Sequence, residues 1–201
     1  MKNKDEFLKI NIIMNQIRKY FEEFTKLSDQ DWKLFSSKLI EVHYPKKTVF
    51  TYKGKIENYL SFIEKGSVRL FIPEEDEDQT FGFCFENQFT SAYDSFITQT
   101  YSTYQIETLT DTKLWRLTYK DLQDIYKQTK IGNVIGRKIA ESLFIMKSKR
   151  EQSLLNDTAE ERYMKLFTEQ PHLMREIPLK YLASYIGITP QALSRIRKRI
   201  S

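Results

Sequence analysis

The sequence predicts an α+β fold in which an antiparallel β-roll, or jelly roll, is joined by a long helix to a pair of short C-terminal helices. Three observations support this prediction. Short β-rich runs separated by turn residues fill residues 42–117. Apolar residues at helical spacing follow from Ile131 onward. Finally, Gly187 and the pair Thr189-Pro190 divide residues 177–200 into two helical segments.

The first 40 residues have the spacing of two or three short helices. Four apolar side chains fall on one helical face, namely Phe7, Ile10, Met14 and Ile17. Ser28 precedes Trp32, Leu34 and Phe35, and a serine at this position is typical of a helix N-cap. We therefore expect helices to flank the β-roll on its N-terminal side.

The β-region contains five clear strand candidates. They are residues 48–52, 59–63, 67–72, 80–85 and 113–117. Turn signals separate them at residues 53–55 and 64–66, each of which contains a glycine. The acidic segment 73–78 is interpreted as a solvated hairpin tip in preference to a metal site.

Helical spacing returns after Leu117. Residues 119–128 form one short predicted helix, and a long helix begins near Ile131. Its apolar stripe contains Ile131, Ile135, Ile139, Leu143 and Met146. Such a stripe packs either against the β-domain of the same chain, which the sequence alone favours, or against a second subunit. Residues 156–158 interrupt the helix and cap the next one, predicted at 159–168.

The C-terminal segment has the pattern of two helices with a tight turn between them. In the first, Leu179, Leu182, Ala183 and Ile186 are predicted to be buried, and Gly187 then supplies a left-handed turn. Thr189 is the predicted cap of the second helix, whose inward residues would be Leu193, Ile196 and Ile200. The outward residues are polar or cationic: Gln191, Ser194, Arg195, Lys198 and Arg199.

This outward face suits a helix that reads the major groove of double-stranded DNA, where Gln and Arg side chains reach base edges. The charge distribution agrees. The chain carries a net charge of +5, and residues 147–201 alone hold 11 Lys and Arg against 6 Asp and Glu. A localised basic segment is typical of a surface that contacts phosphates. The alternative is an ordinary helical hairpin with a solvated charged face.

Composition argues against several other classes of protein. No apolar run reaches the roughly 18 residues of a membrane span, and residues 1–9 are charged where a secretory signal is apolar, so we expect a cytoplasmic protein without a membrane partner. The chain has one cysteine, Cys84, which we expect to be buried, and two histidines, His43 and His172, which lie far apart in the sequence. These residues are too few and too scattered to favour a cofactor or a metal site. We expect no enzyme; the alternative is a cupin-like metal enzyme or ligand-binding protein with an incidental helical C-terminus.

Two segments resemble the Crp/Fnr family of bacterial transcription regulators. Residues 62–70, Phe-Ile-Glu-Lys-Gly-Ser-Val-Arg-Leu, resemble its strand-glycine-strand hairpin. Residues 182–196, Leu-Ala-Ser-Tyr-Ile-Gly-Ile-Thr-Pro-Gln-Ala-Leu-Ser-Arg-Ile, resemble its recognition element. The resemblance spans nearly the whole chain. It implies a cyclic-nucleotide-binding-like domain over residues 1–128, a dimerisation helix over 129–155, and a helix-turn-helix, winged-helix-like domain over 156–201.

The resemblance also implies partners and site residues. The protein would be a homodimer that reads DNA half-sites about 34 Å apart, with RNA polymerase as a further partner. The apolar stripe that contains Ile131, Ile135, Ile139, Leu143 and Met146 would then form the dimer interface. Base contacts would come from Gln191 and Arg195, with Ser194 beside them and Thr189 near phosphate. Lys198 and Arg199 complete the predicted DNA-binding set.

The family's usual input signal does not carry over to this sequence. Relatives that bind cyclic AMP have a Gly-Glu pair followed by an Arg that pairs with the cyclic phosphate, and the positions of this Glu and this Arg are occupied here by Ala92 and Ser102. We therefore expect no tight binding of cyclic AMP. An unidentified small-molecule effector could contact Tyr93, Ser95, Ser102 and Tyr104, although packing roles compete for each. A regulator that needs no ligand is the alternative.

Overall fold

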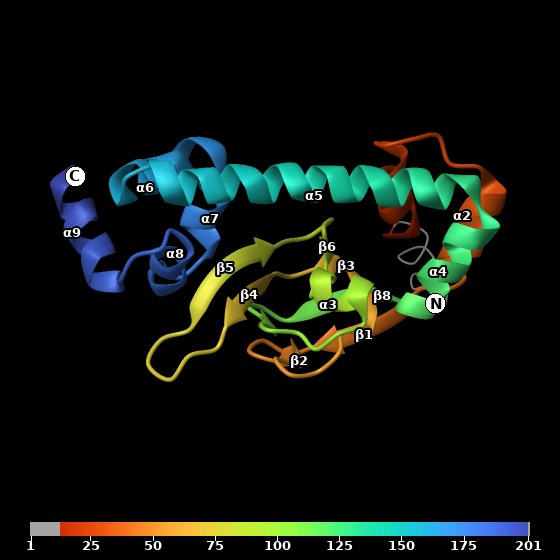
Figure 1. Ribbon diagram of the computed structural model, residues 1–201, viewed down its shortest axis with the longest axis horizontal. Coiled ribbons are helices and arrows are strands. Elements are labelled where there is room, and N and C mark those ends of the chain that lie inside the picture. The colour runs from red at the N-terminus through yellow and green to blue at the C-terminus, as the bar shows by residue number, and fades with distance from the viewer. Residues whose placement is uncertain (1–12, 201) are drawn as a thin grey trace, which may run out of the picture. The chain divides into compact units, whose positions relative to one another are not determined.

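The computed structural model describes residues 13–200, which form two compact units (Figure 1). The first unit contains the described residues up to Leu70 together with Phe83–Ala140, and the second contains Phe71–Gly82 together with the described residues from Glu141 onward. The long helix α5 (Lys130–Asn156) contributes to both units. None of the helices in residues 13–200 is long and apolar enough to cross a membrane.

The β-roll consists of two four-stranded sheets, with strand orders β1-β8-β3-β6 and β2-β7-β4-β5. Their bounds are β1 (Ile40–Tyr44), β2 (Val49–Thr51), β3 (Tyr59–Lys65), β4 (Val68–Ile72), β5 (Gln79–Cys84), β6 (Phe89–Thr90), β7 (Gln105–Thr108) and β8 (Thr112–Thr118). The five predicted strand runs are confirmed as β2, β3, β4, β5 and β8. Strands β1, β6 and β7 were not predicted. Strand β6 has only two residues and β7 only four, whereas the five residues of β1 alternate between apolar and polar side chains, a strand signal that the prediction missed. Cys84, expected to be buried, is partly exposed.

The first sheet has two chemically different faces because side chains alternate along a strand. On one face Phe62, Trp115 and Leu117 are buried in the hydrophobic core with the surrounding helices. On the other face Ser61 pairs across the sheet with Arg116 of β8 on one side and with Thr90 of β6 on the other. One face of this sheet is therefore apolar, and the other carries a row of polar residues.

Helices of the first unit cover the apolar face. They are the helical residues 13–22, α2 (Asp29–Ser36), α3 (Tyr93–Thr98), α4 (Tyr119–Gln128) and the start of α5. The predicted cap is confirmed, since Ser28 Oγ accepts a hydrogen bond of 3.1 Å from the Asp31 amide. The core contains Ile17 and packs against Met14. Phe7 and Ile10, predicted to share this face, lie outside the described residues.

Four helices follow α5 in the second unit. They are α6 (Ala159–Glu169), α7 (Pro171–Glu176), α8 (Leu179–Tyr185) and α9 (Pro190–Ile200). Thr158 begins α6 with a capping box, in which its hydroxyl accepts from the Glu161 amide while Glu161 accepts from the Thr158 amide. The sequence prediction missed α7, which begins at Pro171 directly after α6 ends.

The turn between β3 and β4 requires a glycine. Gly66 has a φ of +98°, and a Cβ there would lie 2.6 Å from Thr112 Oγ1 and 2.7 Å from the Asp111 carbonyl oxygen. Gly54, with a φ of +79°, has no atom within 4 Å of the corresponding position. The two positions therefore share backbone strain but differ in steric space.

Replacing these glycines tests this difference. Gly66→Ala should lower the free energy of unfolding by about 2–4 kcal/mol, because the new methyl adds a clash with backbone to the strain of a positive φ. Gly54→Ala should cost only about 1 kcal/mol, from the strain alone. Urea unfolding followed by tryptophan fluorescence measures both values. Equal losses for the two variants would contradict the steric explanation.

Candidate nucleic-acid interface

Helices α8 and α9 form a helix-turn-helix around Gly187. This glycine has a φ of +76°, and its amide donates to the Ser184 carbonyl at 3.0 Å. A Cβ at Gly187 would meet its nearest atom, Leu154 Cδ2, only at 3.5 Å, so the backbone conformation and not the space calls for glycine. Thr189 caps α9 as predicted, since its Oγ1 accepts from the Ala192 amide at 3.2 Å.

The apolar faces of the two helices meet close to this turn. Leu182 and Ala183 are fully buried, and Ile186, Leu193 and Ile196 are each less than 9% exposed. Two predictions were wrong, because Leu179 is 42% exposed and Ile200 is 39% exposed. Each lies at the end of its helix that is farther from the turn, where the two helices have diverged.

Two arginines fix the C-terminal end of α8. Arg150 Nη2 donates to the Tyr185 carbonyl at 2.6 Å and its guanidinium lies 4.0 Å from the Tyr185 ring centroid. Arg162 Nε donates to the Ile186 carbonyl at 2.7 Å, and its Nη1 donates to the Asp157 carbonyl at 2.6 Å. The last carbonyls of a helix lack donors within the helix. These arginines, distant in sequence, supply them and so hold the turn in place.

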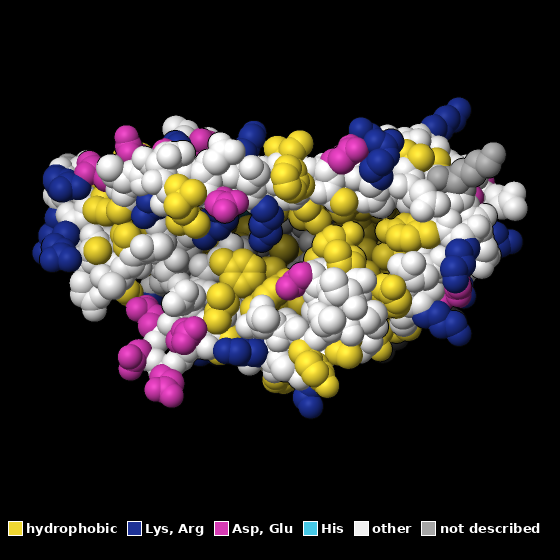
Figure 2. Space-filling view, viewed as in Figure 1, with side chains coloured by type: hydrophobic (Ala, Val, Ile, Leu, Met, Phe, Trp, Pro, Cys, Tyr) yellow, Lys and Arg dark blue, Asp and Glu magenta, His cyan; other side chains and the backbone are white. Residues whose placement is uncertain are grey.

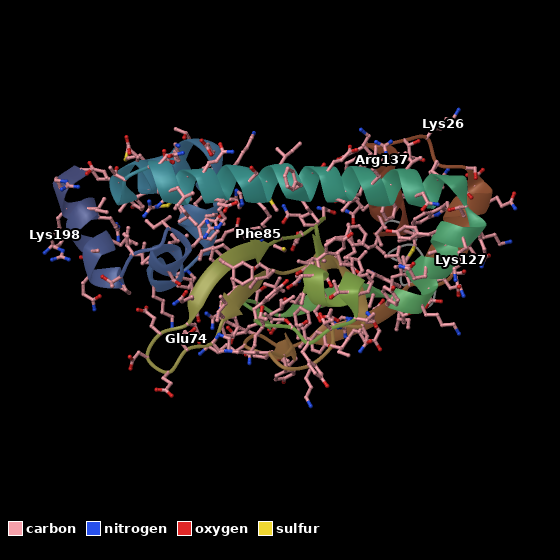
Figure 3. The ribbon with its side chains drawn as sticks, in the orientation of Figure 1. Lys26, Glu74, Phe85, Lys127, Arg137 and Lys198 are labelled. Atoms are coloured by element: carbon pink, nitrogen blue, oxygen red, sulfur yellow. The ribbon has the colours of Figure 1, made fainter. Side chains whose placement is uncertain are left out.

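The outward face of α9 carries the predicted DNA-binding residues. Gln191, Ser194, Arg195 and Lys198 are exposed, and none forms a hydrogen bond or ion pair with any other residue in 13–200. Figure 3 shows the Lys198 side chain directed away from its helix. Arg199 is also exposed but is already paired with Glu160 of α6. Most of this polar face is therefore free to contact a ligand.

The hairpin between β4 and β5 contacts the helix-turn-helix within the second unit. Ser184 Oγ accepts from the Thr80 amide at 2.7 Å and donates to the Asp78 carbonyl at 3.1 Å. Lys147 of α5 lies over the Phe81 ring at 5.1 Å. Sequence reasoning missed Ser184 because its partners lie more than 100 residues earlier in the chain.

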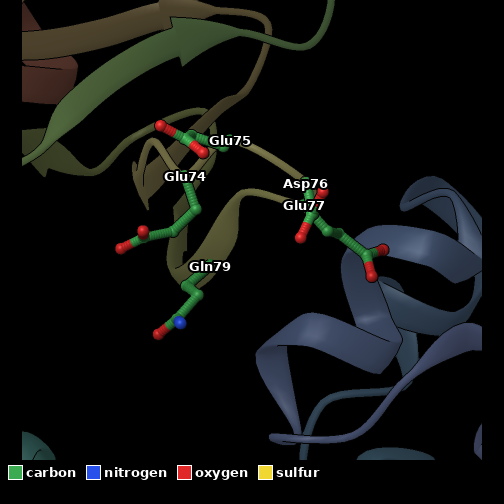
Figure 4. Close-up of a pocket in the computed structure, with 5 residues that line it drawn as sticks. All are labelled: Glu74, Glu75, Asp76, Glu77 and Gln79. Atoms are coloured by element: carbon green, nitrogen blue, oxygen red, sulfur yellow. The ribbon is translucent and has the colours of Figure 1, made fainter.

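The tip of the same hairpin is strongly acidic. Glu74, Glu75, Asp76 and Glu77 are exposed, and with Gln79 they line an open hollow in which the acidic side chains point in different directions (Figure 4). Acidic side chains gather at this tip, and basic side chains gather on the C-terminal helices (Figure 2). The hairpin tip is solvent-exposed, as predicted from its composition.

The predicted effector residues lie close together in the segment from α3 to β7, where each has a partner in the chain. Ser95 Oγ accepts from the Glu57 amide at 3.0 Å, and Ser102 Oγ donates to the Tyr104 carbonyl at 2.8 Å. The Tyr104 hydroxyl donates to Asp94 Oδ1 at 2.8 Å, and burial together with this contact raises the Tyr104 pKa. Tyr93 stacks on Phe96 at 6.3 Å between ring centroids. These contacts stabilise the segment, and a role in effector binding stays a prediction.

The predicted dimer stripe is divided between the core and the solvent. Ile135 belongs to the core of the first unit, and Ile131 and Ile139 pack against it, which is the alternative that the sequence favoured. Leu143 is partly exposed and Met146 is 55% exposed. Other exposed apolar residues on the same helix are Phe144, Ile145, Leu154 and Leu155, the last at 79%. The second half of α5 therefore presents two groups of exposed apolar side chains, at residues 144–146 and 154–155, and the exposed residues between them are Lys147, Lys149, Glu151 and Gln152.

Comparison with known proteins identifies the β-roll. Residues 41–129 match the family model of the cyclic nucleotide-binding domain. No curated protein sequence matches the chain. The matched segment begins within β1 and ends just after α4, so it covers the whole β-roll.

Several solved structures have a similar fold, and proteins described as regulators are among them. A putative transcriptional regulator of the Crp/Fnr family from Eubacterium rectale has a TM-score of 0.69 at 18% identity, covering 90% of this chain and 87% of that one. The c-di-GMP responsive global regulator CLP from Xanthomonas campestris has a TM-score of 0.67 at 18% identity, and the match covers 86% of this chain and 91% of that one. FixK2 from Bradyrhizobium japonicum has a TM-score of 0.67 at 16% identity, and the match covers 81% of this chain and 84% of that one. The resemblance to Crp/Fnr proteins is confirmed by the fold.

Removal of one arginine tests how the turn is held. Arg162→Met should destabilise the helix-turn-helix by about 1–3 kcal/mol, because two carbonyl oxygens lose their donor. Amide hydrogen exchange of residues 179–200 should accelerate accordingly. Lys165→Met, on the same helix, removes only an exposed ion pair with Asp157 and should change exchange little. Unchanged exchange in Arg162→Met would show that the arginine does not hold the turn.

Proposed function

We propose that this chain, whose fold is that of the Crp/Fnr regulators, is a homodimeric, sequence-specific DNA-binding transcription regulator that does not use cyclic AMP. The observation that carries the proposal is the outward face of α9, where Gln191, Ser194, Arg195 and Lys198 are exposed and have no partner within residues 13–200. A cationic helix face without internal partners, in the second helix of a helix-turn-helix, suits recognition of the major groove.

Each residue of this face has a distinct expected role. Arg195 would donate two hydrogen bonds to a guanine edge, and Gln191 would pair with an adenine edge, with Ser194 beside them. Thr189 accepts from the backbone with its oxygen and can still donate its hydroxyl proton to a phosphate. Lys198 and Arg199 would neutralise phosphates, which for Arg199 requires sharing or release of Glu160.

Dimerisation would use the exposed half of α5. Phe144 lies above Leu155, and Leu143 above Leu154, because eleven residues are close to three helical turns, about 3.6 residues each. These residues extend the predicted stripe beyond Met146 toward the C-terminus. A two-fold arrangement of two recognition helices would then read a pseudo-palindromic site.

Control of DNA binding would come from the β-roll. An effector bound there would shift the equilibrium between helix arrangements that differ in the spacing of the two recognition helices. A regulator that needs no ligand is the alternative, and full operator affinity of the ligand-free protein would favour it. The similar solved structures support a regulator and give no support to a cupin-like enzyme.

Two substitutions in α9 separate base recognition from phosphate contact. The bound sequence is first selected from genomic fragments. Arg195→Ala should then lose about 1–3 kcal/mol of discrimination at one base-pair position, because a bidentate guanine contact is lost. Lys198→Gln should instead weaken binding to all sequences and reduce the slope of log affinity against log salt by about 1. Titration of labelled duplexes at several salt concentrations measures both. Unaltered sequence specificity in Arg195→Ala would overturn the assignment.

The dimer surface is tested by placing charge on it. Phe144→Asp combined with Leu155→Asp should shift the protein to monomer, because two carboxylates would need to be desolvated at the interface. Ile97→Asp provides a control, since Ile97 is 49% exposed on α3 and should leave the dimer intact. Sedimentation velocity distinguishes the two states. A dimeric double variant, or a monomeric wild-type protein, would refute this surface as the interface.

A further inference from the structure

Arg116 of β8 is a buried cation without a carboxylate partner. It is 7% exposed, its Nε donates to Ser61 Oγ at 3.3 Å and its Nη1 donates to the Tyr44 hydroxyl at 2.8 Å. The guanidinium lies 4.1 Å from the Tyr59 ring centroid. Within residues 13–200 it forms no ion pair, and its Nη2 forms no hydrogen bond. Aromatic rings offset only part of the cost of removing such a charge from water.

A second buried arginine shows what is missing at Arg116. Arg69 of β4 is 4% exposed and its Nε lies 2.7 Å from Glu107 Oε2. The β-roll therefore supplies a carboxylate for one buried guanidinium and none for the other. Breaking a buried pair, or leaving one charge alone, is strongly unfavourable. A negative charge supplied from outside the chain would complete the surroundings of Arg116.

Two hydroxyls on the same face of this sheet as Arg116 also lack acceptors. Thr90 Oγ1 is fully buried, and no hydrogen-bond partner lies near it among the described residues. Ser61 accepts from Arg116 but donates its own proton to no residue in 13–200. Because Ser61 pairs with both Arg116 and Thr90 across neighbouring strands, the three side chains lie in a row at steps of about 4.8 Å. Each side chain of the row therefore has at least one hydrogen-bond donor without an acceptor in residues 13–200.

The row lies on the inner face of the β-roll. Its side chains are opposite those of Phe62 and Trp115, which are in the core with the helices. The Arg116 guanidinium also lies 5.7 Å from the ring of Phe50, on β2 of the second sheet. These donors therefore lie between the two sheets, within the segment that matches the cyclic nucleotide-binding domain.

We propose that Arg116, Ser61 and Thr90 form a binding site for the oxyanion group, phosphate or carboxylate, of a small organic ligand. The free Nη2 supplies a charge-assisted hydrogen bond, and the two hydroxyls donate to the remaining oxygens. The proposed site does not include Ser102, the position at which relatives that bind cyclic AMP have their arginine. Anion binding at this site does not depend on the proposed DNA-binding function. Only the further step, that the bound anion is the effector of the regulator, rests on that proposed function.

Thermal unfolding in matched anions tests the site. Wild-type protein is melted at one pH and one ionic strength in sodium chloride, inorganic phosphate or sodium acetate. An anion that binds the folded state raises the melting temperature, and above the dissociation constant the stabilisation grows with the logarithm of the anion concentration. Phosphate or acetate should stabilise the wild type beyond chloride, and whichever gives the larger shift identifies the preferred oxyanion.

Variants separate binding from general salt effects, since phosphate stabilises many proteins without a site. Arg116→Met should keep only this general effect and weaken the apparent anion affinity at least about tenfold. Thr90→Val replaces an unsatisfied hydroxyl by a methyl, so it should be neutral or stabilising without anion while reducing the anion shift. Thr90→Val also tests the site on its own, should Arg116→Met not fold.

Equal anion shifts in the wild type and Thr90→Val, or in the wild type and Arg116→Met, would overturn the proposal, as would the absence of any shift beyond chloride. Arg195→Ala serves as the control on the DNA-binding face and should show the full wild-type anion shift. A failure of the DNA-binding proposal would therefore leave this measurement unchanged, and the two proposals can fail separately.

Discussion

The alternation of side chains along β8 constrains most of the first unit. This strand lies between β1 and β3 in the first sheet, and its alternating side chains face the helical core on one side and the second sheet on the other. Trp115 and Leu117 supply the apolar face that the helices cover, and Leu114 and Arg116 are buried on the other. A shift of one residue in register would exchange the faces and place Arg116 among the core aromatics. The strand therefore fixes the helical core and the polar row at the same time.

In the second unit, hydrogen bonds from arginines to backbone carbonyls hold the structure in place. The turn of the helix-turn-helix depends on donors from α5 and α6, which reach the end of α8 through Arg150 and Arg162. Arg150 and Arg162 lie on α5 and α6, whereas Arg195 and Lys198 on α9 form no hydrogen bond or ion pair within residues 13–200. The division between arginines that hold the fold and those that face solvent explains how a basic segment can be both well packed and available to phosphates.

The sequence predicts those features that depend on local chemistry. Periodicity and capping residues located α4 and the start of α6, and the glycine at 187 with Thr189 located the turn and the cap of α9. Features that depend on distant residues were not predictable from pattern alone. Leu179 satisfies the helical spacing yet is exposed, because burial depends on where two helices cross. Ser184, Arg150 and Arg116 have partners that only the folded chain brings near, so no local signal identifies them.

The β4–β5 hairpin makes the second unit discontinuous in sequence. Residues 71–82 leave the β-roll, supply the Thr80 and Asp78 contacts to Ser184, and return as β5. A recombination point in α5 that exchanged only the residues after it would transfer the helix-turn-helix without this hairpin. The new protein would then need a hairpin of its own that fits Ser184 and Lys147. Substitutions in the hairpin and at Ser184 are therefore expected to depend on one another, whereas Arg195 and Lys198 form no hydrogen bond or ion pair within residues 13–200.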